Sequence, residues 1–186
     1  MLKKNFDYTF VLLLIPIWLP LILIIAITSL IFNGRPIFFT QLRGGYKNKK
    51  IKIIKFRTIN SNNDINYYSN LLRFFKFDEL PQFINILKGD LSLVGPRPLH
   101  YEYKSLYKKK YLKRFNVMPG ITGWSQIHDN YKMTWSKKFD LDLWYVDNHN
   151  FFLDLKIIFL TIKNLVFSIL NKNKKTNLIK KFNGSN

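Results

Sequence analysis

An uncharged apolar run extends from Tyr8 to Phe32 and constrains the fold more than any other feature of the chain. As one continuous helix it would be about 37 Å long, which exceeds the roughly 30 Å hydrocarbon core of a bilayer. A cleaved signal peptide is the competing interpretation, but the run is longer than the apolar region of such a peptide, and no small-x-small cleavage site follows it. The run is therefore predicted to be a membrane segment.

Two prolines inside this run, Pro16 and Pro20, leave its path through the membrane open to two interpretations. Pro20 has no N–H for the carbonyl of Pro16 and its ring presses on that turn, so a kink is expected. Basic residues lie both before the run, at Lys3 and Lys4, and after it, within 35–50. A spanning helix should instead show an asymmetric charge distribution. We therefore expect a re-entrant helix, broken at Pro20, with both ends on the cytoplasmic side; a kinked spanning helix is the alternative.

The composition limits the possible partners. The chain carries 30 Lys and Arg against 11 Asp and Glu, a formal charge of +19, which favours an anionic partner: nucleic acid, lipid headgroups or a phosphorylated substrate. There is no cysteine and there are three scattered histidines, so disulfides and thiolate metal sites are excluded and a zinc site is disfavoured. A metal ion in this chain would be a hard cation held by oxygen ligands.

The remaining sequence predicts an α/β fold that is mostly helical, with little strand. A short strand is expected around Ile51–Ile54, an exposed loop over 60–70, and a helix that begins near Asp78 and stops at Gly89. Further helices are expected over 101–115, 135–146 and 151–170, the last amphipathic and suited to a membrane surface, and a turn over 118–124. The predicted domains are the membrane helix (1–34), a compact cytoplasmic catalytic domain with interfacial helices (35–170) and a basic tail (171–186).

Two adjacent acids, Asp78 and Glu79, stand out in so basic a chain. Their simplest interpretation is an N-cap and a first-turn acid, both favoured by the helix dipole. The sequence also supplies cations that would lower the pKa of a carboxyl, keep it ionised and bind phosphate oxygens: Lys55, Arg57, Arg73 and Arg97. Mg²⁺ often takes one or two carboxylates together with substrate phosphates. Phosphoryl chemistry is therefore a candidate function.

The longer context of the acid pair resembles a known family. The run FDELPQFINILKGDLSLVGPRP, with KFRT before it, PGITGW after it, the proline-broken apolar helix and the closing LDLKI, resembles the monotopic bacterial phosphoglycosyl transferases, also called bacterial sugar transferases. Within this family the chain is most similar to the small PglC-type members, which consist of the catalytic domain and its re-entrant helix. The similarity extends from residue 3 to residue 184.

This resemblance implies a reaction and a place. A sugar 1-phosphate would pass from a UDP-sugar to undecaprenyl phosphate on the cytoplasmic face of the bacterial inner membrane, with release of UMP, as the first membrane step of glycoprotein, O-antigen or capsule assembly. Anionic lipids would be further partners, and no nucleic acid is expected. Asp78 would be the nucleophile that carries the covalent phosphosugar, and Glu79 would share Mg²⁺ with it.

The resemblance also implies roles for other residues. Substrate and phosphate binding is expected for Lys55, Arg57, Arg73, Arg97 and Gln126. Supporting roles are expected for Asp142, Asp154, Pro96 and Pro98; the two prolines form a rigid corner that fixes the direction of Arg97. The sequence departs from the family pattern at Leu19, where a serine is common, at Lys76, where a small hydroxyl is common, and over 125–130, which lacks the usual Gly and Arg.

Two other functions remain as alternatives. A membrane-tethered nucleic-acid-binding protein would account for the charge and for the 17% aromatic content, but it leaves the two acids unexplained. A non-catalytic membrane scaffold built on the same fold is the second alternative.

Overall fold

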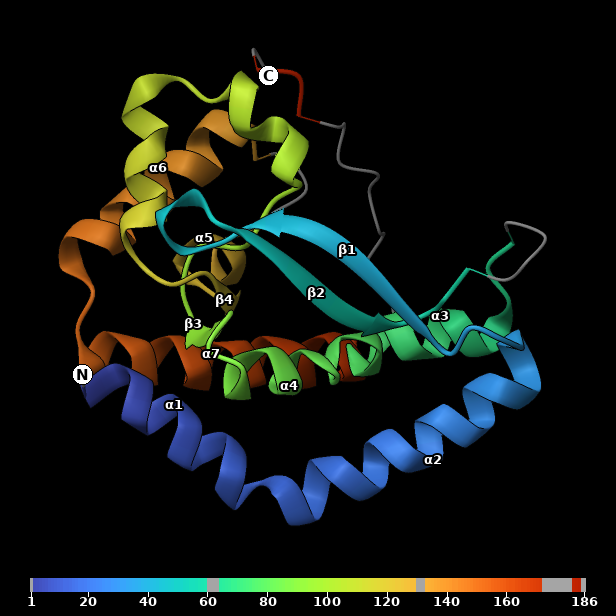
Figure 1. The fold of residues 1–186 in the computed structure, drawn as a ribbon. Helices are drawn as coiled ribbons and strands as arrows, with labels where there is room; N and C mark the ends of the chain where they lie inside the picture. Colours follow the sequence, from blue (N-terminus) through green and yellow to red (C-terminus); the bar gives the residue numbers. More distant parts are fainter. Residues whose placement is uncertain (1, 60–63, 130–132, 172–181, 185–186) are drawn as a thin grey trace. The chain divides into compact units, whose positions relative to one another are not determined.

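The computed structural model describes residues 2–59, 64–129, 133–171 and 182–184, which are mostly helical, as predicted (Figure 1). The strands within these residues form two small two-stranded sheets. The chain divides into two compact units, one of Met1–Gln41 with Lys52–Gly89 and the other of Leu42–Ile51 with Asp90–Asn186. Each unit is described separately below.

The apolar N-terminal run forms two helices in the first unit, α1 (Leu2–Leu13) and α2 (Ile15–Asn33), which meet at an angle (Figure 1). The predicted break at Pro20 is wrong: Pro20 lies inside α2, and the chain breaks at Leu14. Pro16 explains this position, because it lies in the first turn of α2, where a missing amide hydrogen has no helical partner to lose. At Pro20 the helix loses one hydrogen bond and continues.

The break is stabilised by a side chain. In an uninterrupted helix the carbonyl of Val11 would accept from the amide of Ile15, whereas here it accepts from the indole Nε1 of Trp18 at 2.9 Å. Both Val11 and Trp18 are buried. By length and composition, α2 is the described helix that could cross a membrane, with a mean hydropathy of 2.5 in its most apolar window.

Both helices of this pair, α1 and α2, contact other elements of the first unit. At the end of α2, Thr28 and Ser29 lie 2.7 and 3.0 Å from the hydroxyl of Tyr68 in α3 (Tyr67–Phe74). On the other arm, α1 packs on α4 (Gln82–Leu87). Trp18 also meets Phe83 of α4 edge to face, with ring centroids 5.8 Å apart. The two arms therefore bind to the two helices that flank the acid pair in sequence.

The loop predicted over 60–70 is shorter than expected, and residues 60–63 lie outside the described part of the chain. Helix α3 already begins at Tyr67, because the side chain of Asn66 caps it by accepting from the amide of Ser69 at 2.8 Å. Asn66 also donates to the Oδ1 of Asn33 at the end of α2, at 2.8 Å. This contact between distant residues could not be predicted from the turn-forming sequence.

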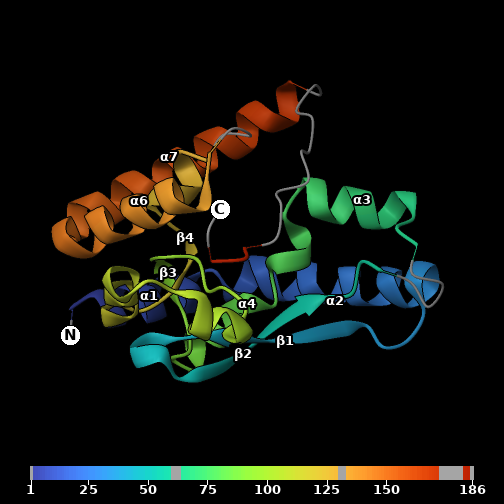
Figure 2. The same cartoon turned by 90° about the horizontal axis from the view of Figure 1, so that it is seen from above.

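The predicted strand around Ile51–Ile54 is confirmed as β2 (Lys50–Phe56), which runs beside β1 (Phe38–Gly44) in both views (Figures 1 and 2). A one-turn helix, η1 (Tyr46–Asn48), connects the two strands. The buried amide of Asn85 in α4 holds the backbone of β2: it accepts from the amide of Ile54 at 3.0 Å and donates to the carbonyl of Lys52 at 2.8 Å. This contact fixes the position of α4 on the strand that carries Lys55.

The second unit is built around a short parallel pair, β3 (Ser92–Val94) and β4 (Gly120–Thr122). The turn predicted over 118–124 therefore contains a strand. A side chain at Gly120 would collide with the backbone at Gly95, so glycine is required for this close approach. The basic segment 101–115 forms two 3₁₀ helices, η3 (Tyr101–Leu106) and η4 (Lys109–Asn116), instead of the predicted α-helix.

Three α-helices complete the second unit: α5 (Trp124–Ile127), α6 (Trp135–Asn148) and α7 (Phe151–Leu170). Its aromatic core includes the buried side chains of Leu99, Tyr111, Phe139 and, from the basic tail, Phe182. Helix α7 is amphipathic as predicted; among its exposed apolar side chains, Phe152, Phe159 and Phe167 are 79%, 66% and 63% exposed.

Candidate active site

The acid pair lies in a 3₁₀ turn, η2 (Phe77–Glu79), between α3 and α4. Lys76 precedes the turn in the left-handed conformation, with φ of 60°, and so reverses the chain direction at the end of α3. The prediction of Asp78 as a helix N-cap is wrong: it lies inside the turn, and no side chain caps it. Its Oδ1 atom is instead buried and accepts no hydrogen bond within the described residues.

Two of the cations predicted from the sequence, Lys55 and Arg73, act on the acid pair. The Nζ of Lys55 lies 2.6 Å from the Oε1 of Glu79, and both side chains are mostly buried. Arg73, at the end of α3, donates from Nε to the hydroxyl of Thr58 at 2.8 Å. The structure therefore brings Lys55, Arg73, Asp78 and Glu79 together within the first unit.

The electrostatics of Asp78 differ from the expectation. Burial and, next in size, the charge of Glu79 raise the pKa of Asp78 above its usual value, and the charges of Lys55, Lys76 and Arg73 only partly oppose the rise. The predicted lowering of this pKa by the cations is therefore wrong in sign, because desolvation outweighs their attraction. The ionised form of Asp78 is therefore poorly solvated.

Arg57 lies at the junction between β2 and the end of α2. Its Nη2 donates to the carbonyl of Asn33, and the side chain of Asn33 donates back to the carbonyl of Arg57 at 3.0 Å. The Nε of Arg57 is buried and has no hydrogen-bond partner in the described structure. Part of its guanidinium thus fixes the end of α2, while its Nε is available to another ligand.

One residue of this site was not predicted. Gln82 is 4% exposed, and its Nε2 donor has no hydrogen-bond partner in the described part of the chain. It follows Asp78 by four residues, at the start of α4. Buried polar atoms without a partner are rare in a packed core, so the Nε2 of Gln82 and the Oδ1 of Asp78 are both candidates for ligand binding. The four-residue spacing from the acid was the available sequence signal.

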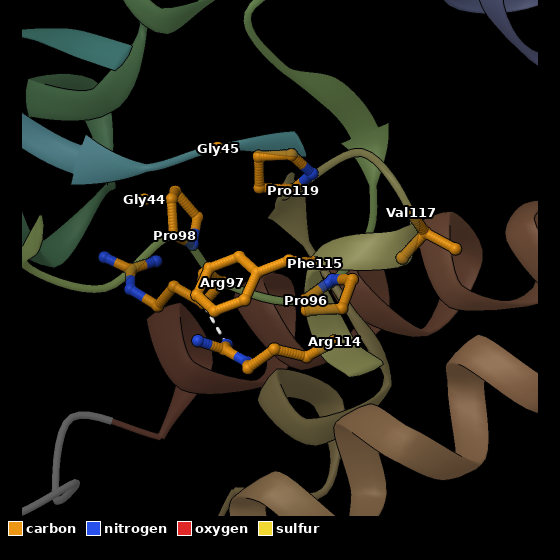
Figure 3. Close-up of a pocket in the computed structure, with 9 residues that line it drawn as sticks. All are labelled: Gly44, Gly45, Pro96, Arg97, Pro98, Arg114, Phe115, Val117 and Pro119. Atoms are coloured by element: carbon orange, nitrogen blue, oxygen red, sulfur yellow. Dashed lines mark hydrogen bonds between the residues drawn. The ribbon is translucent and has the colours of Figure 1, made fainter. Parts of the chain in front are cut away.

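The other predicted residues belong to the second unit. Arg97 lies after β3 in the Pro96–Pro98 corner, beside a small cavity (Figure 3). Asp142 is buried, accepts from Arg114 at 2.8 Å and from the hydroxyl of Ser125 at 2.6 Å. Burial raises the pKa of Asp142, and Arg114, then these hydrogen bonds, oppose that rise. Arg114 was not predicted, since nothing distinguished it from the lysines around it in the segment 108–113.

Two further predicted residues, Gln126 and Asp154, make hydrogen bonds within the second unit. The Nε2 of Gln126 donates to the carbonyl of Ile121 at 2.8 Å, whereas its Oε1 is buried without a partner in the described residues. Asp154 accepts from the hydroxyl of Tyr145 at 2.6 Å and so joins α7 to α6. Gln126 therefore offers an acceptor rather than a donor.

Comparison with known proteins identifies the family. The family model described as bacterial sugar transferase matches residues 1–168, nearly the whole chain. The chain belongs to the bacterial sugar transferase family.

Named relatives of this sugar transferase differ in length. It is 43% identical over 178 residues to the uncharacterized sugar transferase EpsL of Bacillus subtilis, covering 90% of this chain and 88% of the relative. It is 34% identical over 183 residues to the UDP-glucose:undecaprenyl-phosphate glucose-1-phosphate transferase of Escherichia coli, covering 87% of this chain. It is 31% identical over 184 residues to the UDP-N-acetylgalactosamine-undecaprenyl-phosphate N-acetylgalactosaminephosphotransferase of Aeromonas hydrophila, covering 89% of this chain. The sugar transferase spans only 39% and 44% of these two longer relatives.

Proposed function

We propose that this sugar transferase transfers a sugar 1-phosphate from a UDP-sugar to undecaprenyl phosphate and releases UMP, as the first membrane step of bacterial glycoconjugate assembly. The names of its relatives support this reaction class. The observation that carries the proposal is the buried Oδ1 of Asp78, which has no partner in the described structure although three cations act on the carboxyl group. Such a carboxylate is positioned for attack on an electrophile rather than for a role in folding.

In the proposed reaction, Asp78 attacks the β-phosphorus of the UDP-sugar. The bond from that phosphorus to the bridging oxygen of UMP breaks, UMP leaves, and an aspartyl phosphosugar forms. The phosphate of the lipid then attacks this phosphorus, which releases Asp78 and forms a sugar diphospholipid. Two successive displacements suit one soluble and one membrane-bound substrate, because neither has to wait for the other.

The cations and Gln82 would bind the phosphate oxygens. Lys55, held by Glu79, and Arg73, held by Thr58, act on Asp78 from fixed positions. The unpartnered amide of Gln82 supplies a neutral donor in the same segment. Donors fixed before the substrate arrives lower the energy of the transition state without reorganisation.

Asp78 and Glu79 fit a magnesium ion. No group of three metal-ligating side chains occurs within the described residues, but Mg²⁺ needs only one or two carboxylates when substrate phosphates complete its shell. The buried, unpartnered oxygen of Asp78 is a ligand of the required type. When bound, Mg²⁺ would neutralise charge on the phosphate oxygens of the donor.

We also propose a monotopic position on the cytoplasmic face of the inner membrane, which the contacts of the α1–α2 pair support. Both arms of the α1–α2 pair bind to elements of the first unit, α1 to α4 and the end of α2 to α3. A re-entrant path returns both arms to the side of the membrane on which the acid pair lies. The exposed apolar face of α7, with Lys156 and Lys163 among its exposed residues, would lie at an interface with anionic lipid.

The decisive experiment measures UMP release from a panel of UDP-sugars with Mg²⁺, first without the lipid acceptor. The wild-type chain should release one equivalent of UMP in a burst, and its mass should increase by that of one sugar phosphate. Asp78→Asn should show neither effect, whereas Asp140→Asn, a surface control, should behave as wild type. A wild-type chain that releases UMP only when the acceptor is present would refute the covalent intermediate.

The alternatives and the topology have tests of their own. Retention of nucleic acid that weakens with salt, without turnover of any donor, would favour the nucleic-acid-binding protein. Inactivity of the wild type with every donor, without such retention, would favour the scaffold. Because the chain has no cysteine, Lys3→Cys can be labelled selectively; labelling by an impermeant reagent from the periplasmic side would refute the re-entrant helix.

A further inference from the structure

In the Pro96–Arg97–Pro98 corner, each of the three backbone carbonyls accepts a hydrogen bond. The carbonyl of Pro96 accepts from the amide of Gly120 at 3.1 Å, that of Arg97 from the Nη2 of Arg114 at 2.8 Å, and that of Pro98 from the Nη1 of Arg43 at 3.4 Å. The proline rings fix their own φ angles, and the residue before a proline is itself restricted. The backbone of Arg97 is therefore restricted, in part by the side chain of Arg114.

Arg114 is an unusual residue to bury. Its side chain is 3% exposed and lies against Tyr107, Phe115 and Phe139, with the guanidinium carbon 5.3 to 5.7 Å from their ring centroids. Its donors reach the hydroxyl of Tyr107 at 3.0 Å and the carboxylate of Asp142 at 2.8 Å. A buried ion pair contributes little net stability compared with apolar residues of similar size, so stability alone does not account for it.

The Arg114–Asp142 pair acts on Arg97 through a hydrogen bond to its backbone. In Figure 3 the hydrogen bond from Arg114 runs to the backbone of Arg97, while the side chain of Arg97 leaves the corner in another direction, toward the left of the view. Arg114 thus contacts the backbone of Arg97 through the Arg97 carbonyl. Its hydrogen bond does not involve the guanidinium of Arg97. Ser125 completes the chain of contacts through its 2.6 Å hydrogen bond to Asp142.

We propose that Arg114 and Asp142 are positioning residues, which fix Arg97 for binding to the phosphates of the nucleotide-sugar donor. This inference rests on the proposed function. Arg114 itself does not touch the substrate; it acts through the backbone of Arg97. Removal of the pair would leave the guanidinium of Arg97 present but free to adopt other orientations.

A double-mutant cycle tests this coupling. Arg114→Met combined with Asp142→Leu replaces the buried pair with apolar side chains of similar size, which keeps the core filled. The variant should lose roughly 100-fold in kcat/KM for the UDP-sugar, the loss typical of a misplaced binding group, with a Tm close to that of wild type. In an Arg97→Ala background the same two substitutions should cause no further loss. Lys113→Met, which removes the exposed ion pair with Asp147, is the matched control and should retain wild-type kcat/KM.

A milder variant covers the case in which the core does not tolerate the exchange. Ser125→Ala removes one hydrogen bond from Asp142 and should cause a smaller loss of kcat/KM that also disappears in the Arg97→Ala background. If these variants lower kcat/KM by the same factor in the Arg97→Ala background as in the wild type, the inference is overturned while the proposed function stands. Wild-type kcat/KM in both the Arg114→Met/Asp142→Leu variant and Ser125→Ala would have the same consequence. A wild-type chain that releases no UMP from any donor would overturn both.

Discussion

The indole Nε1 of Trp18 donates a hydrogen bond of 2.9 Å to the carbonyl of Val11, across the break between α1 and α2. Val11 and Trp18 are 0% and 6% exposed, so water has little access to either the donor or the acceptor. A side chain thus performs the task of a backbone amide at the point where the helix is interrupted.

Trp18→Phe keeps an aromatic ring against Phe83 but removes the donor, so the carbonyl of Val11 loses its partner. We expect the free energy of unfolding in detergent to fall by about 1–3 kcal/mol, the cost of an unsatisfied buried polar group. Thermal unfolding followed by near-ultraviolet circular dichroism measures the change. Trp144→Phe is the control, because Trp144 is 42% exposed; equal losses in the two variants would contradict the role of the indole N–H.

The raised pKa of Asp78 predicts a pH-dependent cost in stability. Since burial raises the pKa of Asp78 in the folded chain above its usual value, the folded chain binds the proton more tightly than the unfolded chain. The stabilisation from this proton is present below the unfolded pKa and is lost as the pH rises through the folded pKa. At neutral pH the ionised carboxylate therefore destabilises the fold.

Asp78→Asn removes that charge and should raise Tm at pH 7 in a buffer with a chelator, although it abolishes the UMP burst. The difference in Tm between the variant and the wild type should narrow as the pH is lowered toward the unfolded pKa. Asp140→Asn, which changes an exposed ion pair, should alter stability by no more than about 0.5 kcal/mol. A wild-type chain that is more stable than Asp78→Asn at pH 7 would show that the carboxylate is well solvated.

Several elements were predictable because the signal is local. The charge-free run, the alternating residues of β2 and the glycine after α4 each determine their structure through neighbours in sequence; Gly89 adopts φ of 77°, as a helix stop requires. The acid pair and Lys55 were also predictable as a group, and the structure places them together.

The failed predictions have different physical reasons. The break occurs at Leu14 rather than at Pro20, because Pro16 fits the first turn of α2 and Trp18 supplies a donor to the carbonyl of Val11. Helix α3 extends into a polar segment because Tyr68 reaches α2. The pKa of Asp78 was predicted in the wrong direction, because a sequence shows which charges are available but not how much water remains around a carboxyl group. The burial of Arg114 was not predicted, because the sequence does not distinguish it from the lysines of the segment 108–113.

Tyr145 and Asp154 provide a test of the packing between α6 and α7. The hydroxyl of Tyr145 donates to the buried carboxylate at 2.6 Å, and the tyrosine is 1% exposed. Because hydrogen bonds to charged groups contribute more than neutral ones, Tyr145→Phe should lower the free energy of unfolding by about 1.5–3 kcal/mol. Chemical denaturation measures this loss. Tyr46→Phe, at a partly exposed site in η1, should have little effect; equal stability of wild type and Tyr145→Phe would show that the contact contributes nothing.

Gln82 and Asn85 both lie in α4 but differ in their hydrogen bonds. Its neighbour Asn85 has both amide atoms hydrogen-bonded to β2, whereas the Nε2 of Gln82 has no partner in the described residues. Gln82→Met removes a buried unsatisfied donor with little change in volume, so it should keep or raise Tm. If Nε2 binds the transferred phosphoryl group, the same variant should reduce the rate of the UMP burst by roughly 100-fold, the usual effect of losing one such donor. Asn85→Leu should instead lower Tm, because it removes the hydrogen bonds of Asn85 to β2. A Gln82→Met variant with a wild-type burst rate would assign this glutamine to the core.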